Sequence, residues 1–347
     1  MMTGVSFVIP VHNGASCVAD TVASIVAQAD GRPMEIIVVE DGSVDESAAI
    51  LRRLMEDHPL RVVPGPGRGA AAALNEGIRL AAHPIICQVD QDVVLERRWM
   101  TTLVAALDDP AVAAAQGRYI ADSRASFFAR IMGLDLEQRY RSIGEYPDHV
   151  CTGNTAYRAS ALQAIGLLDD SLGYGYDNDL SYRLQAAGYR LAFCRDARSR
   201  HQWREGMKGY LVQQYGFGYG RLDVVARHPT RWTGDAVSPA RMMAHPFLTA
   251  AAVFLLMGGA LSAMVAGPTF GLVAAGITVL FALVVERAVA GIRAWRRFGD
   301  ATALAFPFVH LARDAAWVAA VLVWTGRRAL RRPFRPSDSM AARVDAR

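Results

Sequence analysis

The stretch PIICQVDQD, residues 84–92, indicates the fold class of this chain of 347 residues. It joins a short apolar run to two aspartates, and similar apolar runs come before it at residues 5–10, 35–39 and 60–63. Segments with helical spacing separate these runs, at residues 15–29, 46–56 and 70–82. Strands that alternate with helices of this length predict right-handed crossovers and a parallel sheet. We therefore expect an α/β fold with a mostly parallel sheet flanked by helices.

The chain after residue 99 has a mixed pattern. Strands are predicted at 111–116 and 151–158, with an irregular stretch up to residue 146 between them. Helices are predicted at about 178–187 and at 205–227. We therefore assign residues 1–230 to one domain, followed by a linker at 231–245.

The C-terminal third is apolar in a different way. Residues 246–285 contain no charged side chain, and a bilayer core needs about 20 apolar residues per helix. The pattern predicts a transmembrane helical hairpin with its turn at Gly267 and Pro268. Residues 301–325 are also apolar, but they contain His310, Arg313 and Asp314.

Basic segments flank this third apolar stretch. Arg287, Arg293, Arg296 and Arg297 lie in segment 286–300, and further arginines lie in the tail at 326–347. Positive charge resists crossing a membrane, so both segments are expected to stay in the cytosol. The stretch 301–325 is therefore expected to be an interfacial or re-entrant helix.

Charge and cysteine usage exclude several classes of protein. Residues 1–245 carry 25 Lys and Arg against 28 Asp and Glu, a net charge of −3. A nucleic-acid surface would need clustered cations there, so no nucleic-acid partner is expected. The four cysteines are far apart and form no CxxC pair, which indicates a reduced setting without a metal-thiolate motif.

Two aspartates, Asp90 and Asp92, follow the fourth predicted strand. Ligands of parallel sheets sit beyond the carboxyl ends of the strands. In extended chain, residues two apart point the same way, so both carboxylates could face one cation. Hard oxygen ligands suit Mg²⁺ or Mn²⁺. The alternative is a solvated loop after a strand.

The second predicted strand also ends in acidic residues. Ser43 and Glu46 have the spacing of a capping box that starts the next helix. Asp41 has no such role and is expected to point into the cleft, where its carboxylate could accept the N–H of a nucleobase. No glycine-rich phosphate loop follows the first strand, which argues against a Rossmann dehydrogenase, a Walker-type NTPase and a nucleotidyltransferase. The sequence GPGRG at 65–69 is expected to be a turn.

A third acidic cluster, YDNDLSYR, occupies residues 176–183. Asp177 could cap the helix that follows, near its positive end. It could equally serve as the general base for a sugar hydroxyl. Position alone leaves both roles open.

In this order and spacing, the clusters resemble the family 2 glycosyltransferases of the GT-A fold, over roughly residues 5–225. Residues 8–13 look like the family's opening strand, and 40–43 resemble its base-recognition motif. Asp90-Gln91-Asp92 resembles its DxD motif, and residues 151–156 its sugar- and acceptor-lining strand. Residues 176–183 match the segment written ED-x-DL-x-x-R, with Tyr176 in place of the glutamate.

The resemblance implies roles for named residues. Asp177 is the expected catalytic base. Asp92, Asp90 and His201 are the expected ligands of Mg²⁺ or Mn²⁺. The expected substrate-binding residues are Pro10, Asn13, Glu40, Asp41, Arg68, Asp90, Gly153, Asn154, Asp179 and Arg183.

The resemblance also implies an activity. A hexosyltransferase of this kind would transfer a sugar, with inversion, from a nucleotide-sugar, expected to be a UDP-sugar. The expected acceptor is a hydroxyl of a lipid-linked saccharide or of a growing surface polysaccharide. A basic Tyr/Gly stretch at 213–229 is similar to one in exopolysaccharide-assembly members, and the QxxRW signature of processive synthases is absent. The enzyme is expected in the cytoplasmic (inner) membrane, with its catalytic domain facing the cytosol.

Two alternatives remain open at this point. The acceptor could be a polyprenyl phosphate, which needs no strong base. The chain could also be a non-catalytic membrane subunit that kept the GT-A fold, and Tyr176 in place of the glutamate favours that reading.

Overall fold

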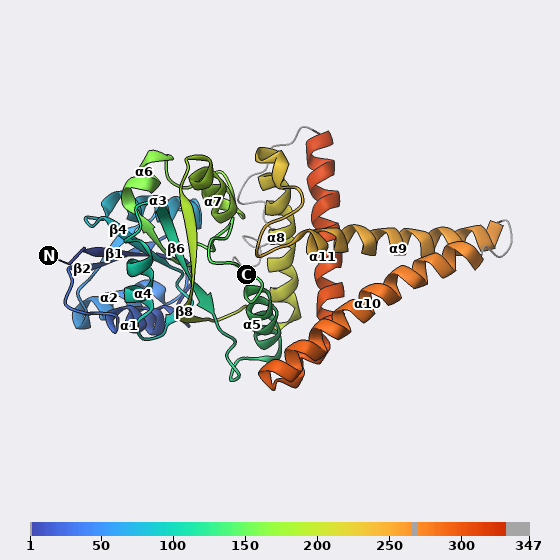
Figure 1. Cartoon of the computed structure of the whole chain (residues 1–347), viewed down its shortest axis with the longest axis horizontal. Helices are drawn as coiled ribbons and strands as arrows, with labels where there is room; N and C mark the ends of the chain where they lie inside the picture. The colour runs from blue at the N-terminus through green and yellow to red at the C-terminus, as the bar shows by residue number, and fades with distance from the viewer. Residues whose placement is uncertain (1, 266–269, 331–347) are drawn as a thin grey trace. The chain divides into compact units, whose positions relative to one another are not determined.

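The computed structural model describes residues 2–265 and 270–330. These residues form two compact units (Figure 1). Unit 1 contains the chain up to Asp122 together with Arg139–Trp203, and unit 2 contains Ser123–Gln138 and the described part of Arg204–Phe334. The sequence prediction placed residues 204–230 with the sheet domain, whereas here they group with the C-terminal helices.

Within the described residues, unit 1 contains one sheet with the strand order β3-β2-β1-β4-β7-β6-β8-β5. The strands are β1 (Val5–Val11), β2 (Met34–Glu40), β3 (Leu60–Pro64), β4 (Ile85–Val89), β5 (Val93–Leu95), β6 (Val112–Tyr119), β7 (Asn154–Arg158) and β8 (Arg190–His201). β1 pairs in parallel with β2 and β4, β2 with β3, and β6 with β8. β7 is antiparallel to β4 and β6, and β5 is antiparallel to β8. The expected α/β class with a mostly parallel sheet is confirmed.

Helices cover both faces of this sheet. They are α1 (Val18–Val26), α2 (Ser47–Asp57), α3 (Ala70–Leu80), α4 (Trp99–Ala106), α6 (Ala159–Ala164) and α7 (Tyr176–Ala186). α1, α2 and α4 lie on one face, and α3, α6 and α7 lie on the other (Figure 1). On the second face, Val8, Leu74 and Leu180 are fully buried in one apolar cluster. Burying a side chain of this size contributes about 1.5–3 kcal/mol.

Several elements differ from the sequence prediction. β8, a strand of 12 residues, and the short β5 were missed, because the apolar run of β8 covers only residues 191–194 and charged side chains interrupt the rest of the strand. The stretch before residue 146 was expected to be irregular, yet α5 (Phe127–Tyr140) forms there. α4 was also missed, although its Trp99 is buried and packs 6.3 Å from the ring of Phe7.

Unit 2 is helical. Its elements are most of α5, α8 (Gly206–Arg227), the 3₁₀ turns η1 (Pro229–Arg231) and η2 (Ala301–Ala305), α9 (Ala240–Val265), α10 (Phe270–Phe298) and α11 (Phe306–Ala329). α9 and α10 run side by side as a hairpin (Figure 1), and the predicted turn at Gly267 and Pro268 lies outside the described residues. The two helices are longer than the predicted hairpin. α9 begins within the predicted linker at 231–245, and α10 continues through most of segment 286–300. Three segments of unit 2 are long and apolar enough to cross a membrane: α9, α10 and residues 301–329.

Buried charges join these helices to one another. Arg287 of α10 is 2% exposed and forms an ion pair with Asp314 of α11, which is 1% exposed. Asp314 also accepts a hydrogen bond from the hydroxyl of Thr249 at 3.1 Å. Arg313 and His310 lie 3.5 and 3.4 Å from the carboxylate of Asp135. Arg287, expected in a basic cytosolic segment, instead lies in a buried ion pair.

Candidate active site

The two aspartates of the DQD sequence follow β4 in a turn. The N–H of Val93 donates to the carbonyl of Asp90 at 3.1 Å, so residues 90–92 are not the extended chain that the sequence reasoning assumed. The turn nevertheless brings the carboxylates of Asp90 and Asp92 together, within 4.8 Å of each other. Gln91 points elsewhere, because its side-chain oxygen accepts the N–H of His12 at 2.8 Å. Gln91 therefore fixes the end of β4 to the end of β1.

His201 reaches the same place through strand pairing. β8 runs antiparallel to β5, and His201 pairs with Val93, directly after the turn. Its Nε2 lies 3.5 Å from Oδ1 of Asp92 and within 4.8 Å of the Asp90 carboxylate. Trp203 stacks on the imidazole at 4.1 Å, and Tyr119 meets it edge-on at 5.4 Å. The aromatic rings hold the imidazole in place, so the structure brings together all three predicted metal ligands.

The donor set fits a divalent cation. Two carboxylates and one imidazole converge on one point, and Mg²⁺ and Mn²⁺ accept such ligands. Burial, together with the negative charges of Asp92 and Asp177, raises the pKa of Asp90 to about 7. A bound cation would offset this repulsion. Gly153 makes room for the cluster, because a Cβ there would lie 2.0 Å from Oδ2 of Asp90.

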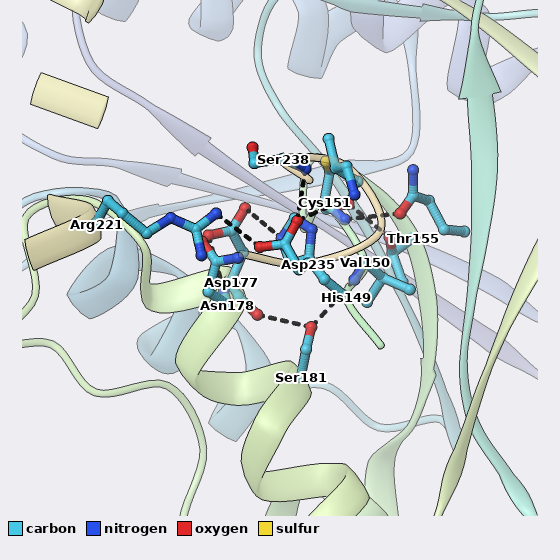
Figure 2. A network of polar contacts seen from close by, with 12 residues as sticks. His149, Val150, Cys151, Thr155, Asp177, Asn178, Ser181, Arg221, Asp235 and Ser238 are labelled. Carbon is cyan, nitrogen blue, oxygen red and sulfur yellow. Dashed lines mark hydrogen bonds and ion pairs between the residues drawn. The ribbon is translucent and has the colours of Figure 1, made fainter. Parts of the chain in front are cut away.

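Asp177 lies in the first turn of α7, in a second cluster (Figure 2). The N-cap of α7 is Gly175, with φ +79°, so the capping role considered for Asp177 is wrong. Its Oδ1 accepts the N–H of Asn178 at 2.9 Å, and its Oδ2 lies 3.4 Å from Nε2 of His149. Cys151 completes this cluster.

Asp41 has an environment that the sequence did not reveal. Its two carboxylate oxygens accept the N–H groups of Gly67 and Gly69, at 2.6 and 2.9 Å. The side chain is 6% exposed, and Gly65 permits this approach because a Cβ there would lie 2.5 Å from Oδ1. Asp41 therefore anchors the turn at 65–69.

The residues around Asp41 shape the ends of β1 and β2. Glu40 accepts the N–H of Ser43 at 2.6 Å. Asn13, with φ +52°, donates its N–H to the Ser43 hydroxyl at 3.0 Å and accepts the N–H of Val44 at 2.8 Å. The N-cap of α2 is Glu46, and no side chain makes a capping hydrogen bond there, so the expected capping box of Ser43 and Glu46 is wrong.

Two other predicted substrate-binding residues have very different exposure. Pro10 is buried within β1, opposite Val39. The Arg68 side chain is 63% exposed and lies 3.1 Å from the carboxylate of Asp170. Of the two, only Arg68 presents its side chain to solvent.

Three predicted substrate-binding residues have structural contacts instead. Asn154 is fully buried and accepts the indole N–H of Trp99 at 2.5 Å. Asp179 is 4% exposed and pairs at 2.7 Å with Arg183. Arg183 also donates to the carbonyls of residues 165 and 167, at 2.8 and 2.7 Å. These contacts secure α4 and α7, and the predicted contact of the three residues with substrate stays a prediction.

Several residues of the two clusters had no predicted role: His149, Gln91, Tyr119 and Trp203. Cys151 was expected only as part of a segment that lines the sugar and acceptor site, not as a possible metal ligand. The spacing of His149 and Cys151, two residues apart, was the only sign in the sequence that they form a cluster. That spacing alone does not identify a site, because the third member, Asp177, is brought close only by the tertiary structure.

A solved structure shares this architecture. A mannosyltransferase from Pyrobaculum calidifontis, solved with GDP-Man and Mn²⁺, matches with a TM-score of 0.60 at 19% identity, over 94% of this chain and 88% of its own. The chain has the GT-A fold. Residues 6–166 match the model of glycosyl transferase family 2, so the chain carries a family 2 glycosyltransferase domain.

Curated relatives agree with this assignment. A pre-mycofactocin glycosyltransferase of Mycobacterium tuberculosis is 28% identical over 69% of this chain and 51% of its own length. An N-acetylglucosaminyltransferase of Azorhizobium caulinodans is 28% identical over 60% of this chain and 57% of its own. A poly-β-1,6-N-acetyl-D-glucosamine synthase of Staphylococcus epidermidis is 25% identical over 55% and 48%. The chain thus spans about half the length of these relatives.

Proposed function

We propose that this protein transfers a sugar from a nucleotide-sugar, a UDP-sugar, to a hydroxyl of a lipid-linked saccharide or of a growing surface polysaccharide. The observation that carries the proposal is the convergence of Asp90, Asp92 and His201 within 4.8 Å, beyond the carboxyl end of β4. In wound sheets this is where ligands bind. The names of the relatives, which include an N-acetylglucosaminyltransferase and a polysaccharide synthase, support a sugar donor and a glycan acceptor.

Asp92, Asp90 and His201 would hold Mg²⁺ or Mn²⁺, which when bound neutralises charge on the leaving diphosphate. The Asp90 N–H donates to the carbonyl of Gly153 at 3.2 Å. This bond holds the first ligand at the start of β7. Trp203 restricts rotation of the His201 ring. The protein therefore supplies a cation site whose ligands are already positioned.

Asp177 would act as the base. Its Oδ1 is occupied by the N–H of Asn178, whereas its Oδ2 faces His149. Oδ2 takes the proton of the acceptor hydroxyl while that oxygen attacks the anomeric carbon. Attack from the side opposite the diphosphate inverts that carbon.

The membrane part of the proposal depends on exposed apolar side chains. On α9 and α10, Phe254, Met264 and Phe281 are 78%, 84% and 67% exposed. Such side chains are stable in lipid, which supports a transmembrane hairpin of α9 and α10. The proposal puts this hairpin in the cytoplasmic (inner) membrane with the catalytic domain facing the cytosol, because Arg296 and Arg297 at the end of α10 favour the cytosolic side.

The third apolar segment has a different setting. In its apolar stretch of 18 residues, 44% of the residues are buried within the protein, whereas the share is 17% in the corresponding stretch of each hairpin helix. α11 runs from Phe306 to Ala329 as one helix, which suits the interfacial form rather than a re-entrant one. The basic tail, placed in the cytosol by this proposal, lies mostly outside the described residues.

The decisive experiment is a panel of nucleotide-sugars tested with the detergent-solubilised full chain for Mn²⁺-dependent release of nucleoside diphosphate. Asp92→Asn should remove the metal dependence. Asp177→Asn should lower transfer to a hydroxyl acceptor by about 10²–10⁴-fold and leave nucleotide binding unchanged. Asp57→Asn, at an exposed position on α2, is the matched control.

Each outcome separates the rival functions. Full transfer by Asp177→Asn would refute the base role and favour a phosphate acceptor, which needs no strong base. If no nucleotide-sugar is turned over and Mn²⁺ does not bind, the chain is a membrane subunit without catalysis.

A further inference from the structure

The cluster of His149, Cys151 and Asp177 contains three different kinds of metal ligand. The three ligand atoms (Nε2, Sγ and a carboxylate oxygen) all lie within 4.8 Å of one another. His149 is 5% exposed, and the other two are half-buried. Figure 2 shows their side chains gathered where the segment before β7 meets the first turn of α7. This cluster is separate from the ligand set of Asp90, Asp92 and His201.

The distances suit one tetrahedral ion. Metal bonds of about 2.0–2.1 Å to nitrogen and oxygen place two tetrahedral ligands about 3.3–3.4 Å apart. Nε2 of His149 and Oδ2 of Asp177 are 3.4 Å apart, which is longer than a hydrogen bond of about 2.9 Å. A thiolate at about 2.3 Å from the same ion lies about 3.6 Å from the other ligands. Cys151 is within 4.8 Å of both, so a shift of about 1 Å brings it into place.

Hydrogen bonds hold the two ligand-bearing segments together. The hydroxyl of Ser181 accepts the N–H of Val150 at 3.1 Å and donates to the carbonyl of Asp177 at 2.7 Å. The N–H of Cys151 donates to the side-chain oxygen of Gln116 at 2.8 Å. Ser181 is fully buried and Gln116 nearly so. The backbone beneath the ligands is therefore fixed before any ion binds, which lowers the ordering cost of binding.

The chemistry of the donors selects the ion. Thiolate and imidazole ligands favour Zn²⁺, whereas Mg²⁺ and Mn²⁺ favour oxygen. Three protein ligands also leave a fourth tetrahedral position for water, as in open zinc sites. We propose that His149, Cys151 and Asp177 form a second metal site, which takes Zn²⁺ in preference to Mg²⁺ and Mn²⁺.

This site has a consequence for activity, and that part of the inference rests on the proposed function. A carboxylate bound to Zn²⁺ cannot accept the proton of an acceptor hydroxyl. Zn²⁺ therefore inhibits sugar transfer at a site distinct from the one that Mn²⁺ activates, and added Mn²⁺ relieves the inhibition poorly. Removing the thiol weakens inhibition without removing the base.

Co²⁺ is the probe for the site, because its bond to a thiolate gives a near-ultraviolet charge-transfer band. The full chain in detergent is titrated with Co²⁺ and then with Zn²⁺. We expect the band in the wild type and in Asp92→Asn, and its displacement by Zn²⁺. Cys151→Ser should lack the band and bind Zn²⁺ about 10²-fold more weakly. Cys194→Ser, at the other half-exposed cysteine, is the matched control and should keep the band.

The outcomes decide the inference. A wild type without the band, or a band that persists in Cys151→Ser, overturns it. Unchanged Mn²⁺ affinity at the first site shows that Cys151→Ser is folded. A band with no sugar transfer under any condition would leave the metal site standing and refute the proposed function alone. Zn²⁺ inhibition that is equal in the wild type and Cys151→Ser overturns the inhibitory role.

Discussion

Replacing Gly153 by alanine tests whether Asp90 must occupy its observed position. A Cβ on residue 153 would lie 2.0 Å from Oδ2 of Asp90 and 2.2 Å from its Cγ, and side-chain Cβ atoms essentially never approach other atoms more closely than 3.0 Å. The difference between 3.0 and 2.0 Å requires a movement of about 1 Å. The carboxylate must turn away, or the start of β7 must move from β4.

The expected cost follows from that displacement. A misplacement of about 1 Å in a positioned group can lower the rate by about 10²-fold. The added methyl group also overpacks the site, at a cost of about 1–3 kcal/mol of folding free energy. We expect Gly153→Ala to bind Mn²⁺ more weakly and to lower kcat/KM for the nucleotide-sugar by about 10²-fold.

The assay is Mn²⁺-dependent release of nucleoside diphosphate, with the Mn²⁺ concentration varied. Gly144→Ala is the matched control, because a Cβ there meets no atom within 4 Å and its φ is not positive. If Gly153→Ala bound Mn²⁺ and turned over like Gly144→Ala, the placement of Asp90 beside Gly153 would be wrong.

Three further experiments test packing and electrostatics. Asn75→Ala removes hydrogen bonds of 2.9 and 3.0 Å to the carbonyl and N–H of Leu168, and should lower the free energy of unfolding by about 2–5 kcal/mol in a denaturant titration. Asp314→Ala leaves the Arg287 guanidinium buried without its carboxylate, at a cost of about 3–5 kcal/mol, and Arg287→Met with Asp314→Leu should recover most of the melting temperature in detergent. Burial raises the pKa of the Cys194 thiol to about 11, so its alkylation rate at pH 8 should be low and rise about tenfold per pH unit below that pKa.

These expectations have clear contrary results. Wild-type stability of Asn75→Ala would mean that water replaces the lost amide. If the double variant Arg287→Met with Asp314→Leu is no more stable than Asp314→Ala, the instability of Asp314→Ala does not come from the unpaired charge of Arg287 alone. Rapid alkylation of Cys194 at pH 8, compared with a free thiol peptide, would contradict the raised pKa.

The sequence by itself determined the alternation of strands and helices in the first ninety residues. Apolar runs such as residues 85–89 are decided by local periodicity, and acidic residues after a strand belong to its carboxyl end whatever the rest of the fold does. The positions of Asp90 and Asp92 at one edge of the sheet therefore followed from the sequence. So did the apolar character of the C-terminal helices.

Tertiary structure decided which residues meet. The half of β8 that ends at His201 has no apolar run, so only the pairing of β8 with β5 and β6 brings His201 to Asp92. At Asn154 the motif predicts a ligand contact, and only the tertiary structure shows that its side chain accepts a hydrogen bond from the buried Trp99. His149, Cys151 and Asp177 come from separate stretches, and the hydroxyl of Ser181 links those stretches. Side-chain convergence depends on strand register and helix docking, which are long-range properties that local periodicity does not encode.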